Sequence, residues 1–309
     1  MRSLTLVAAA ALTAVGLAAC GDDPSGIDNA TEQDRQAAVE ELDASGWFAD
    51  VYGVEGAAED LDFAVSFDLG LVPSAVQDTV PLVWRWGRRH GQPESRQITV
   101  TITGDTARVE AVVTFDGVFG LDRTFDSVVN PTQKPLQEQA VQYATLVRRP
   151  ADDTTGRAWR LVALSPREWR MTDETKRTVA ITRVVVRVNS ETKIDVTDPA
   201  ELFDVNNRIP RLQLGDSVSV LAEVENTTGT DNVPPTFVFL HVYHHGPTAR
   251  GWVRIPMRQR EDGVFVRHWI VRFPGRERIV VDAIDSQTFN TDTEDDYRAN
   301  GWGIPYRIE

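Results

Sequence analysis

The residues best suited to ligand chemistry stand together in the run Trp84-Arg85-Trp86-Gly87-Arg88-Arg89-His90. On a strand, Trp84 and Trp86 would share one face, because successive side chains alternate. Two indoles beside guanidinium groups could bind a sugar ring or an anionic ligand by stacking and charge-assisted hydrogen bonds. The alternative, which the sequence favours, is that both indoles belong to the core and the arginines solvate a turn. The ligand-binding candidates are Trp84, Trp86, Arg88 and Arg89.

No set of residues converges on catalysis. Glycine-rich phosphate loops and the HExxH, GxSxG and Walker patterns are absent from the sequence. His90 lies between Gly87 and Gly91, which predicts an exposed turn rather than a buried His–Asp dyad. Asp68 and Asp116 could face a pocket, but nothing in their spacing selects them. We therefore assign no catalytic residue, and a non-enzymatic role is favoured.

Two segments have the composition of metal sites. His241 and His244 would point to opposite faces of one strand, so they cannot meet at one metal unless the strand ends or bulges. The run Asn290–Asp296 has oxygen ligands at alternate positions, as calcium loops do, but it lacks the glycine and the final glutamate of an EF-hand. We expect no resident cofactor, and we keep Asp292, Glu294 and Asp296 as candidates for an irregular calcium site.

Cys20 is the only cysteine, and it follows Leu17-Ala18-Ala19 at the end of an uncharged apolar run that begins near Leu4. The run is shorter than the roughly 20 residues that a membrane-spanning helix needs. The motif resembles the lipobox of bacterial lipoproteins, in which a signal peptidase cuts before a lipid-modified cysteine. The resemblance implies a signal peptide over residues 1–19, a lipidated tether over 20–30, and attachment through Cys20. Gly21 directly after the cysteine favours the outer membrane over the inner one in a Gram-negative envelope.

Charge is unevenly placed along the chain. Residues 21–60 hold twelve acidic residues and one basic residue, whereas residues 61–309 hold 34 acidic and 30 basic residues. The acidic part should be held off an anionic membrane surface. Because there is no basic stripe, we expect no nucleic acid partner.

Residues 31–172 predict an α+β domain. Thr31 and Asp34 have the spacing of a helix N-cap, and Ser45-Gly46 predicts the end of that helix. Alternating strands follow, with a turn at Gly104-Asp105. We expect helices packed on a curved antiparallel sheet. The run Ile98–Phe115 and the end of the region, Trp159–Pro166, resemble a nuclear-transport-factor-2-like domain, which implies a cone-shaped pocket.

Residues 175–309 predict an all-β sandwich, with the polar stretch Pro166–Lys176 as the junction. Short strands separated by Gly/Pro turns are typical of that architecture. The runs Gly215–Val220, His268–Gly275 and Arg278–Asp285 resemble immunoglobulin-like or fibronectin-type-III-like modules, which serve as spacers or protein-contact domains.

The sequence as a whole predicts a lipid-anchored envelope protein that binds or scaffolds an envelope protein or a glycan. Two alternatives stay open: a small-ligand carrier or enzyme that uses the pocket of the first domain, and a carbohydrate-binding protein that uses Trp84 and Trp86.

Overall fold

The computed structural model describes residues 31–48, 64–65, 85–124, 126, 128–229, 235–245, 250–271, 275–291, 293 and 296–309. The predicted signal peptide, Cys20 and Trp84 lie outside these residues. Over the described residues the protein is mainly β, with one substantial helix, and the curved antiparallel sheet was predicted correctly.

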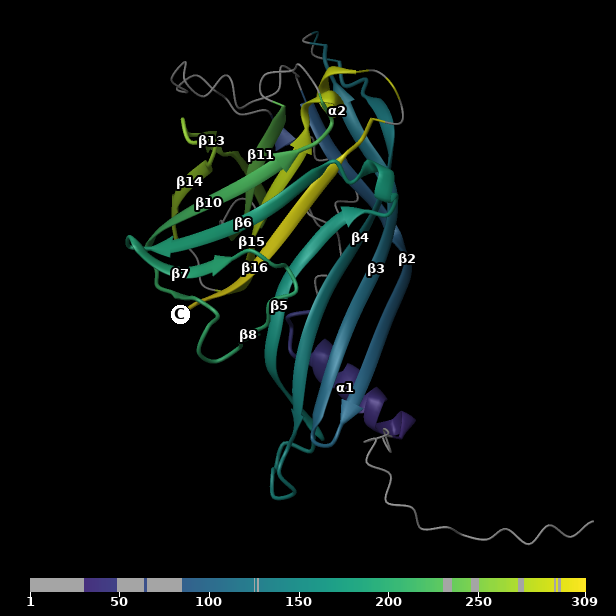
Figure 1. Ribbon diagram of the computed structural model, residues 1–309, viewed down its shortest axis with the longest axis vertical. Coiled ribbons are helices and arrows are strands. Elements are labelled where there is room, and N and C mark those ends of the chain that lie inside the picture. Colours follow the sequence, from purple (N-terminus) through teal and green to yellow (C-terminus); the bar gives the residue numbers. More distant parts are fainter. Residues whose placement is uncertain are drawn as a thin grey trace, which may run out of the picture.

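The larger sheet is a curled antiparallel half-barrel (Figure 1). Its order is β1 (Ala64–Val65), β2 (Arg85–Thr103), β3 (Thr106–Asp122), β4 (Thr132–Arg148), β5 (Trp159–Met171), β16 (Ala299–Ile308), β15 (Gly275–Asp285), β11 (Thr236–His245) and β12 (Arg250–Pro256). Two short strands join it from the side: β8 (Phe203–Asp204) pairs with β5, and β9 (Arg211–Leu212) pairs in parallel with β16.

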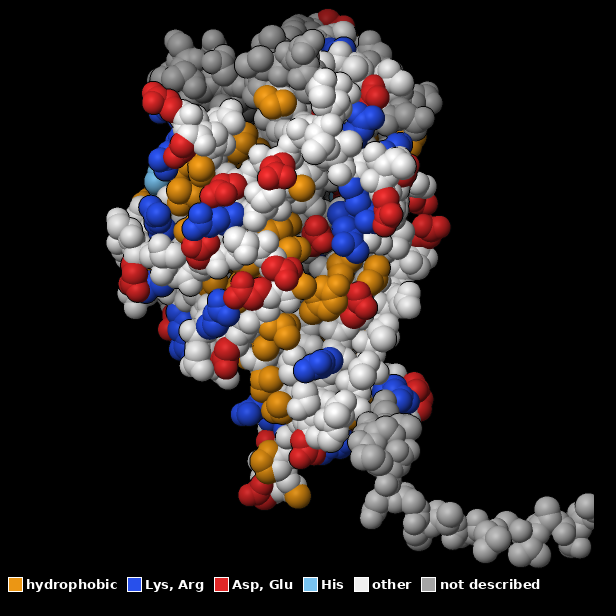
Figure 2. Space-filling view, viewed as in Figure 1, with side chains coloured by type: hydrophobic (Ala, Val, Ile, Leu, Met, Phe, Trp, Pro, Cys, Tyr) orange, Lys and Arg blue, Asp and Glu red, His pale blue; other side chains and the backbone are white. Residues whose placement is uncertain are grey.

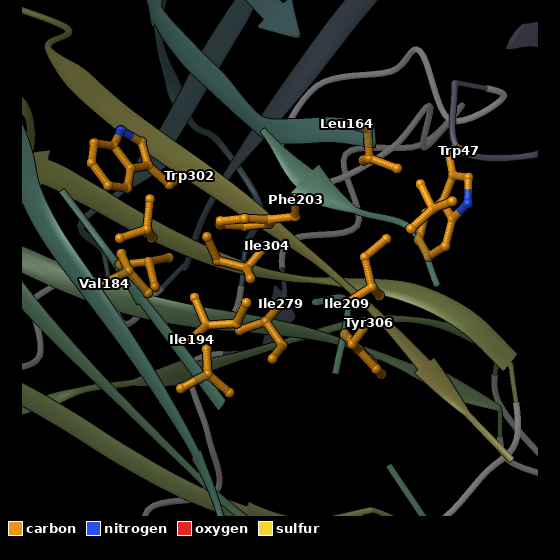
Figure 3. Close-up of a cluster of buried hydrophobic side chains, with 14 of the residues drawn as sticks. Trp47, Leu164, Val184, Ile194, Phe203, Ile209, Ile279, Trp302, Ile304 and Tyr306 are labelled. Atoms are coloured by element: carbon orange, nitrogen blue, oxygen red, sulfur yellow. The ribbon is translucent and has the colours of Figure 1, made fainter. Parts of the chain in front are cut away.

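The second sheet has the order β13 (Arg258–Gln259), β14 (Phe265–Ile270), β10 (Ser217–Asn226), β6 (Val179–Val188) and β7 (Glu191–Val196). It lies in front of β15 and β16 in Figure 1. Apolar side chains fill the space between the sheets, among them Val184 and Ile194 from the second sheet and Ile279 and Ile304 from the first (Figure 3). This layer is a conventional apolar core.

Helix α1 (Glu32–Ala44) begins as the sequence predicts. Thr31 and Asp34 form a reciprocal capping box, which satisfies backbone N–H groups that the first turn of a helix leaves unpaired. Ala38 and Leu42 are buried against the half-barrel, and the Trp159 indole N–H donates to the Asp34 carbonyl oxygen over 3.1 Å. The helix therefore closes the lower end of the half-barrel in Figure 1, and the short helix α2 (Ser286–Asn290) lies at the upper end.

The predicted junction at Pro166–Lys176 is wrong over its first part. Pro166 lies inside β5, which continues to Met171, and only Glu174–Lys176 forms a short 3-10 turn before β6. Strand β5 then pairs with β16, with Trp169 opposite Gly301, so one hydrogen-bonded sheet runs across the expected boundary at residues 172–175. Local composition suggested a junction because Arg167, Glu168 and Arg170 are charged, yet Arg167 is buried inside the half-barrel.

Gly117 allows β2 and β3 to approach closely beside an irregularity in their pairing. The register shifts between His90 and Pro93. A Cβ on Gly117 would overlap the Arg89 carbonyl oxygen and lie 3.0 Å from the His90 Cα. The contact is with backbone, so no side chain can turn aside to relieve it.

We expect Gly117→Ala to lower the free energy of unfolding by about 3 kcal/mol, as overpacking against rigid neighbours does. Gly104→Ala is the matched control. Gly104 has a φ of +56° but open space around its Cβ position, so the control should lose about 1 kcal/mol from backbone conformation. Urea unfolding of both variants measures the difference, and equal losses would contradict the steric explanation.

Candidate functional site

The inner face of β2 carries Trp86, Arg88 and His90, all of them buried, while Arg89 between them is exposed. Trp86 contacts the rings of Phe119, Phe239 and Phe289 at centroid distances of 5.5, 4.8 and 5.0 Å. Its exposed fraction is 5%. This supports the alternative in which the indole belongs to the core.

Arg254 on β12 covers the Trp86 ring. Its guanidinium carbon lies 3.4 Å from the ring centroid, and its Nη2 donates to the Trp86 carbonyl oxygen over 3.1 Å. Cation–π contacts of this kind strengthen when the cation is desolvated, as Arg254 is. The contact joins β12 to β2, the strands near the two ends of the sheet order.

Arg88 is the centre of a buried polar network. Its two terminal nitrogens donate to both carboxylate oxygens of Asp282 on β15, over 2.7 and 2.9 Å. Its Nε donates to the Tyr297 hydroxyl over 2.6 Å. The side chains of Arg88 and Asp282 have no exposed surface. A bidentate pair of this geometry is the strongest form of arginine–carboxylate contact.

Glu138 on β4 forms the second half of the network. The Tyr297 hydroxyl donates to Glu138 Oε1, and His90 Nε2 lies 3.1 Å from Glu138 Oε2. The Arg88 Nε atom is 3.9 Å from the same carboxylate. The Tyr297 hydroxyl thus accepts a hydrogen bond from Arg88 and donates one to Glu138, and it links these two side chains.

His241 on β11 ends the network on the other side, with its Nε2 atom 3.1 Å from Asp282 Oδ2. An ionised carboxylate only accepts hydrogen bonds, so the Nε2 atoms of both histidines carry the hydrogen. Their Nδ1 atoms are buried and have no hydrogen-bond partner among the described residues. The network therefore runs from His90 through Glu138, Tyr297, Arg88 and Asp282 to His241.

The charges of the network stabilise one another against burial. Burial raises the pKa of Glu138, but the hydrogen bond from His90 and the charge of Arg88 outweigh it, and that pKa lies below its usual value. Burial also opposes ionisation of Asp282, yet Arg88 and His241 hold the pKa of Asp282 well below its ordinary range. Burial raises the pKa of Tyr297 well above its usual value, so the phenol stays protonated.

The expectation of an exposed turn at His90 is wrong, because the residue is 7% exposed and sits within β2. The structure instead contains two buried histidine–carboxylate pairs, His90–Glu138 and His241–Asp282. Such pairs are parts of many catalytic sites. Here, the side chains of these four residues are at most 2% exposed, so a substrate in water cannot reach them in this conformation.

A small recess is lined by Phe48, Arg96, Ala111, Val113, Ala140, Gln142 and Arg167. Its volume is about 10 Å³, which is room for one water molecule. Two nitrogens of the buried Arg167, Nε and Nη2, donate to Gln142 Oε1 over 3.2 and 3.0 Å. Polar groups line the recess, but its size excludes an organic ligand.

The metal candidates lie only partly within the described residues. His241 shares its buried face with Phe237 and Phe239, as the alternation predicts, and it binds Asp282. Asp292 and Glu294 are outside the described residues, whereas Asp296 is described and accepts a hydrogen bond from Thr291. Over the residues that are described, no group of three or more His, Cys, Asp or Glu side chains could hold a metal ion.

Comparisons of the chain with protein-family models, with curated proteins and with solved structures gave no match. Within the described part of the chain, no helix is long and apolar enough to cross a membrane. The site is therefore interpreted from its own geometry.

Sequence reasoning selected Arg88 but missed Glu138, Asp282 and Tyr297. The signal was present for Asp282, which interrupts the apolar run Ile279–Ile284 on the face that Val280 and Ile284 share. An acidic residue at such a position is buried and paired more often than solvated. Glu138 likewise lies on the same face of β4 as the buried Leu136 and Ala140.

Arg88→Met should lower the free energy of unfolding by about 3–5 kcal/mol, because it leaves two carboxylates buried without their cation. Arg89→Met is the matched control: it removes the same charge one residue away on the exposed face, and we expect a change within about 0.5 kcal/mol. Denaturant unfolding at neutral pH compares the two. If Arg88→Met were as stable as Arg89→Met, the network would carry no weight in the fold.

Proposed function

We propose that this protein is a lipid-anchored envelope lipoprotein of bacteria that acts as a binding or scaffold protein and not as an enzyme. The observation that carries the proposal is how the described side chains occupy the inside of the half-barrel. The Trp86 aromatic cluster, the Arg88 network and Arg254 occupy it with the chain's own side chains. The residues that could do chemistry are engaged with one another at almost zero exposure.

The lipid anchor is proposed from sequence. Leu17–Cys20 with the apolar run before it supports acylation of Cys20, and Gly21 supports the outer membrane. The tether of residues 20–30 enters the fold at Thr31, the N-cap of α1. The end of the half-barrel that carries α1 would then face the membrane, and the end that carries α2 would face away from it (Figure 1).

The proposed partner is an envelope protein or a glycan. On the face shown in Figure 2, acidic and basic side chains are interspersed. Such a surface supports contacts with proteins better than contacts with a polyanion, since nucleic acid binding draws on clustered positive charge.

The small-ligand carrier or enzyme loses support, because the recess that described residues of the half-barrel line at Gln142 and Arg167 has room for one water. The carbohydrate-binding alternative also loses support, because a buried Trp86 offers no platform for a sugar ring. Arg88 is also buried, and its guanidinium already binds the Asp282 carboxylate.

The finer fold resemblances remain part of this proposal. The packing of α1 against β2 and β5 supports a nuclear-transport-factor-2-like origin for residues 31–172. The packing of β6, β7, β10 and β14 against β11, β15 and β16 supports an immunoglobulin-like origin for residues 175–309. In this interpretation, the pairing of β5 with β16 joined the strands of residues 31–172 and the strands β16, β15, β11 and β12 into one sheet.

We expect the protein expressed in a bacterial host to enter the detergent phase of a Triton X-114 extraction, and Cys20→Ser to move it to the aqueous phase. Several acyl chains on one cysteine anchor stably, because each buried methylene contributes about 0.8 kcal/mol. Ser25→Ala, in the tether, is the control and should stay with the detergent. A Cys20→Ser variant that remains in the detergent phase would contradict lipidation.

A further inference from the structure

The Arg88 network joins strands that the sheet itself keeps apart. In the sheet order, β3, β4, β5 and β16 stand between β2 and β15. Even so, the Arg88 guanidinium meets the Asp282 carboxylate at 2.7 and 2.9 Å. The contact therefore crosses the inside of the curl, and it can form only when the sheet is curled as observed.

Three more contacts cross the same space. Tyr297, just before β16, links Arg88 on β2 to Glu138 on β4, and Arg254 on β12 donates to the Trp86 carbonyl oxygen. The Phe289 ring of α2 packs against Trp86. Ionised side chains therefore cross the inside of the curl next to the aromatic cluster around Trp86.

The core between the two sheets is built differently. Val184, Val186, Val218 and Val220 of β6 and β10 are fully buried and pack with apolar side chains of β11, β15 and β16. The ion pairs of the second sheet, such as those of Arg183 with Asp195 and Glu223, lie on its solvent side with side chains at least 40% exposed. Exposed pairs contribute little to stability, and losing them changes little.

We propose that the Arg88 network is an acid-sensitive clasp: protonation of Glu138 and Asp282 releases Arg88, and the half-barrel opens between β2 and β15 while the second sheet stays folded. Once the carboxylates are neutral, the buried Arg88 cation has lost the charges of Asp282 and Glu138. Opening the curl is then the direct way to hydrate it. This inference is independent of lipidation and of any partner.

The direction of the pH dependence follows from the two carboxylates. Each has a pKa in the folded protein below its usual value, so each stabilises the fold above the unfolded pKa of about 4. That stabilisation is lost as the pH falls further. Arg88 keeps its charge throughout, and the Tyr297 phenol stays protonated.

The other charged groups on the elements around the clasp do not replace the lost charges. His90 and His241 lie at the two ends of the network, where His90 contacts Glu138 and His241 contacts Asp282. Lys134 on β4, Arg254 on β12 and Arg278 on β15 are buried cations, so none of them can take the place of a carboxylate. Asp122 at the end of β3 is buried with Thr124 and Asn130 as its hydrogen-bond donors, away from the network.

Hydrogen exchange measured by mass spectrometry tests the proposal on the full-length protein. Exchange would be followed at pH 7, 4, 3 and 2.5 and corrected for the intrinsic rate at each pH. We expect peptides from β2, which has only the two-residue strand β1 on its outer side, to lose at least tenfold protection at a pH where peptides from β6 and β10 keep theirs. Simultaneous loss in β2, β6 and β10, or earlier loss in β6 and β10, would overturn the clasp.

Two double variants sharpen the test. Glu138→Gln with Asp282→Asn removes the two carboxylates whose protonation opens the clasp, so the protection of β2 relative to β10 should become independent of pH within about twofold between pH 4 and 2.5. Asp195→Asn with Glu223→Gln removes two exposed carboxylates from the second sheet and should leave the acid opening of β2 unchanged. If the first variant does not fold, the order of opening in the unmodified protein decides alone. Acid opening that persists in a folded Glu138→Gln, Asp282→Asn variant would refute the assignment.

Discussion

The ion pair between Arg88 and Asp282 is the constraint on which the half-barrel depends. Moving either charge out of water is costly, and the cost is recovered only when the pair is bidentate and every remaining donor and acceptor is engaged. Tyr297, Glu138 and the two histidines provide that engagement. A partly formed network would make the fold less stable than an apolar core would, because its unpaired polar groups would stay buried. The strands that carry the network must therefore all be in place for it to stabilise the fold.

This requirement fixes strand register. Side chains alternate along a strand, so a one-residue slip of β2 would turn Arg88 toward solvent and bring Arg89 inside. The same holds for Glu138 on β4 and Asp282 on β15. The irregular pairing of β2 after His90, and the glycine at position 117 that accommodates it, lie directly beside the network.

Local structure could be read from the sequence to a useful extent. The helix cap at Thr31 and the turn at Gly104-Asp105 appear as predicted. The sequence does not indicate which strands pair or which of their faces pack against each other. Alternation assigns residues to faces within one strand, but the pairing of β5 with β16 joins residues about 130 positions apart. Arg88 was predicted to solvate a turn because an unpaired arginine belongs in water, and its partner lies 194 residues away.

Residue types alone would have marked the interior as an active site. It holds two histidine–carboxylate pairs, a tyrosine and an arginine, which are the parts of general acid–base catalysis. Catalysis also needs a reacting atom beside them, and here Arg88 donates to Asp282 and Tyr297, and His241 contacts Asp282. The Nδ1 atoms of the two histidines are buried and have no hydrogen-bond partner among the described residues. Side chains that could activate a substrate in an open cleft therefore bind one another here across the curled sheet. The two roles differ in whether a substrate can reach these side chains.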